Sequence, residues 1–170
     1  MRYAKIDRFD VNNGEGVGIS LFVTGCHLRC SGCFNAELRD FSSGQEWTKE
    51  TEEELFLLLE NQHISRVSIL GGDPLAKPNY LTIQVLMRDI KNKYPDKQIW
   101  LFTGLTMEEI NMSQELQSTI AYCDILVDGR FEKDKRDLTL KFRGSSNQRI
   151  WRNNGTEWII EEDSNEQVSN

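Results

Sequence analysis

The sequence predicts an α/β domain whose sheet is mainly parallel. Between residues 48 and 128, short apolar stretches alternate with longer segments whose apolar residues recur at helical spacing. This alternation places successive strands side by side and parallel, joined by right-handed crossovers. A chain of 170 residues, 38% of them hydrophobic, is most simply one domain. We expect residues 1–160 to form it and the polar residues 161–170 to be a disordered C-terminal tail.

The strands are predicted from short β-branched and apolar stretches. Residues 1–17 form a short leading strand and a turn-rich loop, and residues 18–23 form the first core strand. The other predicted core strands are 66–70, 98–103 and 124–128. Beyond residue 129 the alternation stops, and residues 138–160 are expected to form short strands or extended segments.

Three helices are predicted between the core strands, with starts marked by Thr48, Pro78 and Thr106. Glutamates after Thr48 favour the positive N-terminal end of the first helix. Pro78 suits the first turn of the second helix, which Pro95 ends. Thr106 and Glu109 predict a capping box at the start of a single third helix.

Three of the four cysteines lie within eight residues, directly after strand 18–23. Cys26, Cys30 and Cys33 have the spacing C-x3-C-x2-C, whereas Cys123 is far away. Iron–sulfur clusters are held by cysteine thiolates, normally four. Three thiolates on one loop hold three corners of a [4Fe-4S] cube and leave one iron open to another ligand. We expect these three residues to be the metal ligands and the catalytic centre, and Cys123 to be a buried, inert thiol.

The cysteines have two other possible uses, in a structural zinc site and in a disulfide. Structural zinc needs four ligands, and only Cys123, His27 and His63 remain to complete a set with the cysteine loop. A disulfide would leave one of the three crowded thiols unpaired. A zinc-structured binding module or an electron-transfer module without enzyme activity therefore stays as an alternative.

Charge and hydropathy restrict the partners. The formal net charge is −7 and the pI is near 4.9, which argues against nucleic acid as the main partner. No apolar run approaches the roughly 18 residues of a membrane span, and the N-terminal residues lack the apolar region of a signal peptide. We expect a cytoplasmic protein, because free thiols and iron clusters persist in a reducing compartment.

Four motifs follow the predicted strands at their carboxyl ends. These are the cysteine loop, Gly71-Gly72-Asp73-Pro74, Thr103-Gly104 and Asp128-Gly129-Arg130. In parallel α/β sheets, ligands bind beyond this end of the strands. The four motifs are therefore expected on one rim, with the paired glycines letting the backbone approach a ligand closely.

The chain resembles the activating proteins of anaerobic ribonucleoside-triphosphate reductase, a family of small radical S-adenosylmethionine (radical SAM) enzymes. The cysteine spacing is typical of the whole superfamily, and the blocks around Val127-Asp128-Gly129 and Arg143–Gln148 are typical of this family. The matching segments are Asn13-Gly14 with Gly16, 21–35, 71–75, 100–104, 126–131 and 143–148. Phe34 stands where the family usually has Tyr, so the ring is kept and a hydroxyl is lost.

The resemblance implies a truncated, open-sided radical SAM (βα) partial barrel that binds a [4Fe-4S] cluster and S-adenosylmethionine. It implies that a low-potential donor such as flavodoxin reduces the cluster, and that one electron then splits S-adenosylmethionine into methionine and a 5′-deoxyadenosyl radical. That radical takes a hydrogen from a glycine Cα in the large reductase subunit. An activase of another glycyl-radical enzyme, of the formate-lyase or decarboxylase type, stays as an alternative.

Several residues are expected to contact the cofactors. They are Gly32, Cys33, Phe34, Gly71, Gly72, Asp73, Thr103, Asp128 and Arg130. Gly72 is expected to leave space for the amino group of S-adenosylmethionine, and Arg130 to pair with its carboxylate, oriented by Asp128. Phe34 is expected beside the adenine and Thr103 beside the ribose. A surface arginine, a strand cap and a core aromatic are the structural alternatives. Residues 143–148 are expected to grip the glycine loop of the reductase.

Overall fold

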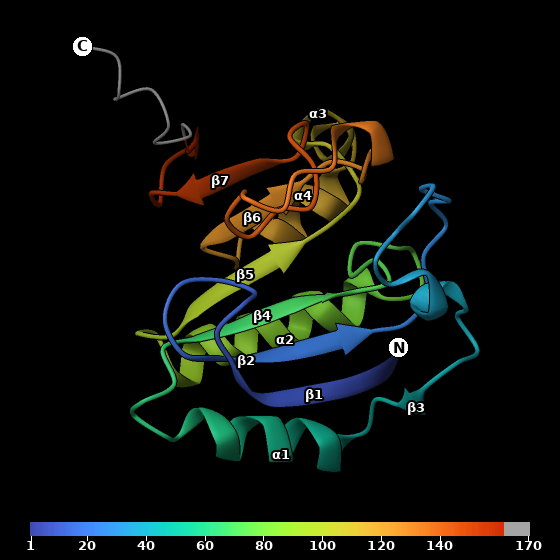
Figure 1. The fold of residues 1–170 in the computed structure, drawn as a ribbon. Coiled ribbons are helices and arrows are strands. Elements are labelled where there is room, and N and C mark those ends of the chain that lie inside the picture. Colours follow the sequence, from blue (N-terminus) through green and yellow to red (C-terminus); the bar gives the residue numbers. More distant parts are fainter. Residues whose placement is uncertain (162–170) are drawn as a thin grey trace.

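The computed structural model describes residues 1–161 and shows one mixed sheet with helices packed against it (Figure 1). The strand order is β3-β1-β2-β4-β5-β6-β7-β8. The strands are β1 (Arg2–Asp10), β2 (Gly18–Val23), β3 (Gln45–Glu46), β4 (Arg66–Gly71), β5 (Gln98–Phe102), β6 (Ile125–Asp128), β7 (Arg149–Asn153) and β8 (Trp158–Ile160). The α/β class is confirmed, and the four predicted core strands lie within one residue of their predicted bounds.

The expectation of a mainly parallel sheet is wrong at both edges. β2, β4, β5 and β6 are parallel, but β1 and β3 on one side and β7 and β8 on the other pair antiparallel. Parallel neighbours need a crossover of a dozen or more residues, usually a helix. The connections 11–17 and 154–157 are too short for that, and residues 129–148 contain only a 3-10 turn.

The helices are α1 (Lys49–Leu59), α2 (Tyr80–Lys93), α3 (Met107–Asn111) and α4 (Gln114–Ile120). Thr48 caps α1, and the capping box of Thr106 and Glu109 at α3 is confirmed. The predicted single third helix is wrong, because Ser113 accepts a hydrogen bond from Leu116 N and starts α4 separately. Pro78 lies just before the cap residue of α2, Asn79, rather than in its first turn.

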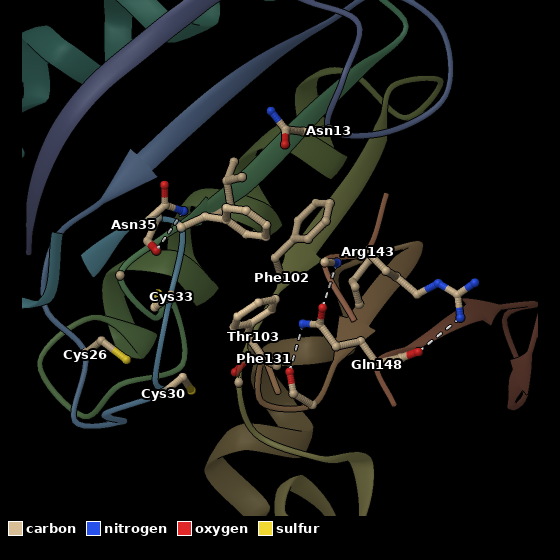
Figure 2. A pocket seen from close by; sticks show the side chains of 18 of the residues that line it. Asn13, Cys26, Cys30, Cys33, Asn35, Phe102, Thr103, Phe131, Arg143 and Gln148 are labelled. Carbon is tan, nitrogen blue, oxygen red and sulfur yellow. Dashed lines mark hydrogen bonds between the residues drawn. The ribbon is translucent and has the colours of Figure 1, made fainter. Parts of the chain in front are cut away.

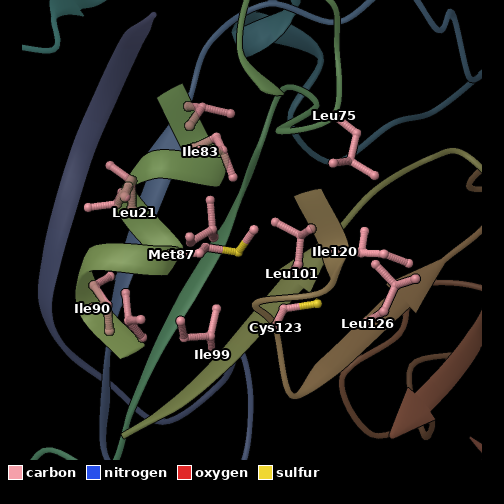
Figure 3. Close-up of a cluster of buried hydrophobic side chains, with 14 of the residues drawn as sticks. Leu21, Leu75, Ile83, Met87, Ile90, Ile99, Leu101, Ile120, Cys123 and Leu126 are labelled. Carbon is pink, nitrogen blue, oxygen red and sulfur yellow. The ribbon is translucent and has the colours of Figure 1, made fainter. Parts of the chain in front are cut away.

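The core lies between the helices and one face of the parallel strands (Figure 3). Leu21, Ile99 and Leu101 point to this side and meet Ile83, Met87 and Ile90 of α2 there. Cys123 lies in the same cluster and is 1% exposed. Its burial raises the pKa of the thiol, so the predicted buried thiol is confirmed. No helix within residues 1–161 is long and apolar enough to cross a membrane.

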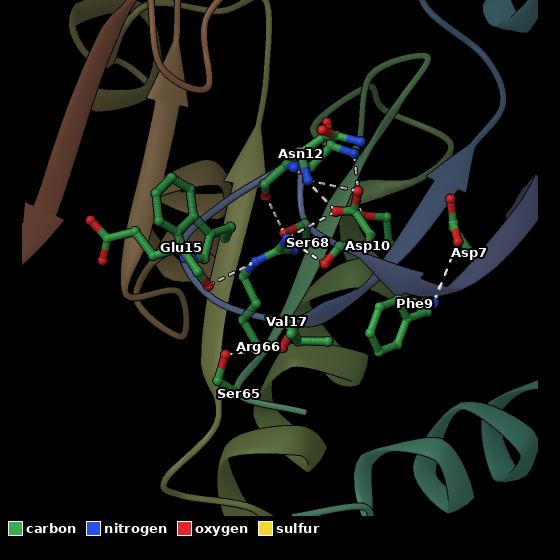
Figure 4. A network of polar contacts seen from close by, with 12 residues as sticks. Asp7, Phe9, Asp10, Asn12, Glu15, Val17, Ser65, Arg66 and Ser68 are labelled. Atoms are coloured by element: carbon green, nitrogen blue, oxygen red, sulfur yellow. Dashed lines mark hydrogen bonds and ion pairs between the residues drawn. The ribbon is translucent and has the colours of Figure 1, made fainter. Parts of the chain in front are cut away.

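A buried ion pair holds the loop between β1 and β2 on the opposite face (Figure 4). Arg66 is fully buried, and its Nη2 lies 3.0 Å from Oδ2 of Asp10. The guanidinium also donates to the carbonyls of Glu15 and Asp10 and to Ser68 Oγ. Asp10 in turn accepts from Ser20 Oγ and from the backbone N–H groups of Asn12 and Asn13. The turn-rich loop is thus anchored at both ends.

Of the expected tail, only Glu161 falls within the described residues; residues 162–170 lie outside them. Glu161 donates its backbone N–H to Ile150 O and accepts from Arg152 Nε at 3.0 Å. It therefore continues the edge of the sheet beside β7.

Separating Arg66 from Asp10 should destabilise the fold. Arg66→Met leaves a buried carboxylate without its cation, and Asp10→Asn leaves a buried guanidinium without its anion. We expect each to lower the free energy of unfolding by about 3–5 kcal/mol, because one uncompensated buried charge is costly. Urea unfolding measures this. The double variant should lose less than the sum of the two single losses, and strict additivity would show that the residues do not act as a pair.

The Arg66–Asp10 pair should also affect how the stability of the protein changes at low pH. Burial pushes the pKa of Asp10 up, but hydrogen bonds from Ser20, the loop backbone and Arg66 outweigh it and hold the pKa below 3.8, its ordinary value. A lowered pKa stabilises the fold above the ordinary value, and this stability is lost as pH falls through the lower one. In Asp10→Asn, urea unfolding at a series of pH values should lack this loss.

Candidate functional site

A cavity of about 440 Å³ lies at the carboxyl ends of the parallel strands (Figure 2). Its apolar walls come from the strands and the segment after β6. They are Phe22, Leu70, Phe102, Val127, Phe131, Leu140 and Phe142. Residues from all four predicted motifs also line it, namely the three cysteines, Gly71 and Gly72, Thr103 and Gly104, and Gly129. The structure therefore brings the four motifs together around one space.

The cysteine loop enters this cavity from the end of β2. Cys26, Cys30 and Cys33 are free, half-buried and part of the cavity lining. Cys26 N donates to Arg39 O at 3.0 Å, and Gly25 N donates to Leu38 O at 2.8 Å. Gly25 has a φ of +92°, and a side chain there would collide with the ring of Phe41. The start of the loop is thus set by backbone bonds.

Gly72 lines the cavity and makes room for the backbone of the cysteine loop. A Cβ on Gly72 would lie 2.5 Å from the carbonyl oxygen of Gly25 and 2.9 Å from its nitrogen. Gly72 N donates to Val23 O, and Asp73 N donates to Gly25 O, both at 2.8 Å. A larger residue at Gly72 would therefore disturb the cysteine loop as well as any ligand beside it. Gly71, with a φ of +117°, likewise has the Val23 backbone against it.

Asp73 and Thr103 contact each other at the rim. Thr103 Oγ1 donates to Asp73 Oδ1 at 2.8 Å, and Leu75 N donates to the same oxygen. Burial raises the pKa of Asp73 to about 6, against the opposing effect of these hydrogen bonds. Asn79, which the sequence patterns did not indicate, donates to the carbonyls of Thr24 and Asp73 at 3.0 Å each. This buried amide joins the two loops.

The expected pairing of Asp128 with Arg130 is wrong. Asp128 is fully buried, accepts from Met107 N at 2.7 Å and pairs with Arg149. Arg130 instead pairs with Glu109 at 2.8 Å and does not line the cavity. No local sequence motif marks Arg149 as the partner of Asp128. The interaction follows from the antiparallel register that sets Asp128 opposite Arg149.

Phe34 joins the cysteine loop to the segment after β6. Phe34 is 53% exposed, and the centroid of its ring lies 5.1 Å from that of Phe131. The guanidinium of Arg136 lies 5.2 Å above the Phe34 ring. A Cβ on Gly144 would lie 2.8 Å from the same ring. Phe34 is therefore a wall residue between two segments and is not part of the core.

The block 143–148 binds its own segment. Gln148 Oε1 accepts from the N–H groups of Gly144 and Ser145, while its Nε2 donates to Gly129 O. Ser145 is fully buried, and Asn147 Nδ2 donates to Arg130 O at 2.8 Å. Most of the polar groups that were expected to grip a partner are occupied in this way. Gln148 emerges as the central residue of the block.

The donor set fits an iron–sulfur cluster in kind, because it consists of three free thiols on one loop that line the same cavity. No three His, Cys, Asp or Glu side chains within residues 1–161 are arranged to hold a metal ion. A single zinc needs ligands that converge on one point, whereas thiolates bound to different irons of a cube stand apart. Burial and the nearby Asp73 raise the pKa of Cys26 to about 11. Because coordination deprotonates a thiol outright, a bound metal overrides this shift.

Comparisons with known proteins agree with this donor set. The family described as a 4Fe-4S single cluster domain matches residues 12–151. The anaerobic ribonucleoside-triphosphate reductase-activating protein of Vibrio cholerae is 40% identical over 89% of this chain and 98% of its own length. The proteins of the same name from Enterobacteria phage T4 and Escherichia coli K12 are each 38% identical, over 93% and 87% of this chain and 98% and 96% of their own lengths.

Adding a methyl group at Gly72 should disturb the cysteine loop. In Gly72→Ala the new Cβ meets the Gly25 backbone, so we expect less than half of the normal cluster content after anaerobic reconstitution, measured as iron and sulfide per chain. Gly104→Ala is the matched control, because its Cβ meets side-chain atoms of Leu28 and Arg130 and no backbone atom. Equal cluster content in both variants would show that the contact between Gly72 and Gly25 does not shape the loop.

Proposed function

This chain belongs to the family of anaerobic ribonucleoside-triphosphate reductase-activating proteins, and we propose that it generates the glycyl radical on the large subunit of such a reductase. The observation that carries the proposal is the loop with three free cysteines that opens onto the 440 Å³ cavity. The relatives' shared name supplies the reductase as the partner. The family match over residues 12–151 includes the whole cysteine loop.

Cys26, Cys30 and Cys33 would hold a [4Fe-4S] cluster, which when bound supplies one electron to S-adenosylmethionine. With this electron the C5′–S bond of the sulfonium would break, giving methionine and a 5′-deoxyadenosyl radical. This radical takes a hydrogen atom from a glycine Cα, leaving 5′-deoxyadenosine and a glycyl radical. A low-potential protein such as flavodoxin would then reduce the cluster again. We propose that this takes place in the cytoplasm.

The residues around the cavity would position S-adenosylmethionine and exclude water. Phe34, Gly71, Gly72 and Thr103, which line the cavity, are the proposed neighbours of this ligand. Gly32 is proposed with them from the loop between Cys30 and Cys33, although it is not part of the cavity lining. Asp73 would support them through its hydrogen bond with Thr103. The aromatic walls from β2, β5 and the segment after β6 keep water and stray hydrogen donors away from a radical. Asp128 and Arg130 are not among the proposed neighbours of S-adenosylmethionine. Asp128 instead pairs with Arg149.

The architecture suits a protein substrate. We propose that the four parallel strands, with helices on one side, form the truncated (βα) barrel of radical SAM enzymes. A complete barrel of eight βα units is typically about 250 residues. The shorter sheet ends at β1 with β3 and at β7 with β8. An open side of this kind admits a loop of another protein.

Two assays test this function together. The anaerobically reconstituted protein should contain about four irons per chain, as a single cube requires, and should cleave S-adenosylmethionine when dithionite is added. With the large reductase subunit present, a glycyl doublet should appear in the electron paramagnetic resonance spectrum. Ala in place of Cys26, Cys30 or Cys33 should abolish the cluster and both activities.

Cys123→Ala is the control, because that thiol is buried in the core and away from the cavity. Loss of the cluster in this variant would contradict a three-cysteine site. A doublet that forms with a formate-lyase or decarboxylase type enzyme, and not with the reductase, would favour the alternative activases. Cluster assembly without cleavage would favour an electron-transfer module.

A further inference from the structure

A second hollow lies against the outer side of the cysteine loop. It has a volume of about 510 Å³ and is lined by residues 27–30 and 130–132. Leu28, Cys30 and Phe131 line both this hollow and the inner cavity. These three residues therefore form a wall between the two spaces, and one of the three proposed cluster ligands is reached from both sides.

The chain is acidic, but this region is basic. Segments 24–35 and 129–136 together contain five Lys and Arg residues and two Asp and Glu residues. The rest of the chain contains 15 Lys and Arg and 25 Asp and Glu. An acidic protein that gathers positive charge around its cysteine loop presents a local surface that attracts a negatively charged partner.

Several contacts place these cations around the loop. A Cβ on Gly32 would lie 3.5 Å from the Lys133 side chain, so that side chain covers the loop. Arg130 and Lys135 are each paired with a glutamate, Glu109 and Glu132. Arg29 is exposed in the hollow and makes no hydrogen bond or ion pair within residues 1–161. Its charge is thus available to a partner.

We propose that the outer hollow is the docking site of the electron donor, a one-electron carrier protein with an acidic face. The proposal rests on the proposed function and adds where the electron enters. One electron leaves the donor's reduced cofactor and one electron enters the cluster beside Cys30, with no bond made or broken in this chain. The glycine loop of the reductase must reach the inner cavity, on the other side of the wall. Donor and reductase therefore have separate approaches.

Binding of reduced flavodoxin tests the proposal directly. We expect Arg29→Glu to weaken its affinity about tenfold at low salt, since charges at the rim of an interface control encounter, and the difference should shrink as ionic strength rises. Glu132→Gln should strengthen binding, because it removes an acid from the hollow and releases Lys135. Arg88→Glu on α2 is the matched control, with the same charge change on an exposed arginine away from the loop.

The remaining measurements separate this site from the activity itself. Dithionite needs no docking surface, so S-adenosylmethionine cleavage with dithionite should be unchanged in Arg29→Glu. Equal weakening of flavodoxin binding by Arg29→Glu and Arg88→Glu, or no weakening by either, would overturn the proposal. A loss of reductase binding in Arg29→Glu with flavodoxin binding intact would assign the surface to the reductase instead. Failure of the unmodified protein to cleave S-adenosylmethionine with dithionite would count against the proposed function and leave the binding result to decide the docking site.

Discussion

The close approach of two backbone segments, Val23–Cys26 and Gly71–Asp73, determines the shape of the site. Gly72 N and Asp73 N donate to the carbonyls of Val23 and Gly25, and no Cβ fits at Gly71 or Gly72. Only glycine permits such contact between main chains. The turn after β4 therefore acts as a template for the first turn of the cysteine loop, and the buried amide of Asn79 joins the two. The position of Cys26 depends on this contact before any cofactor is bound.

Features encoded locally could be predicted from the sequence. The strands at 18–23 and 66–70 are buried β-branched runs, and the caps at Thr48 and Thr106 need only their own neighbours. The meeting of four motifs on one rim follows from parallel strands alone. The antiparallel edges, the Arg66–Asp10 pair and the Asp128–Arg149 pair could not be predicted. Each joins positions far apart in the chain, and the register that brings them together is not visible in local spacing.

In the candidate site, too, the position of a residue could be predicted better than the role of its side chain. Most of the predicted site residues line the cavity, yet several polar side chains bind other parts of the protein. Thr103 binds Asp73, Asp128 binds Arg149, and Gln148 binds its own segment. Buried polar groups at strand ends must be hydrogen-bonded, so they are the first candidates to hold the frame. What remains to line the cavity is mainly glycine backbone, thiols and apolar rings. A sequence motif marks such a position correctly without showing whether its side chain faces the ligand.

The desolvation cost of charged groups explains why the two sides of the cysteine loop differ in charge. Among the described residues that line the inner cavity, Arg143 is the one with a formally charged side chain, and it donates to Gln148 O. An unpaired charge facing such apolar walls would carry a large desolvation penalty. The outer side is exposed to water, where Arg29, Lys133 and Lys135 keep their hydration. The loop therefore faces a cavity with many apolar residues in its walls on one side and a charged, water-exposed surface on the other. Under the proposed function, radical chemistry would use the first environment and recruitment of a charged protein the second, so one thin loop could serve both because its two faces differ in polarity.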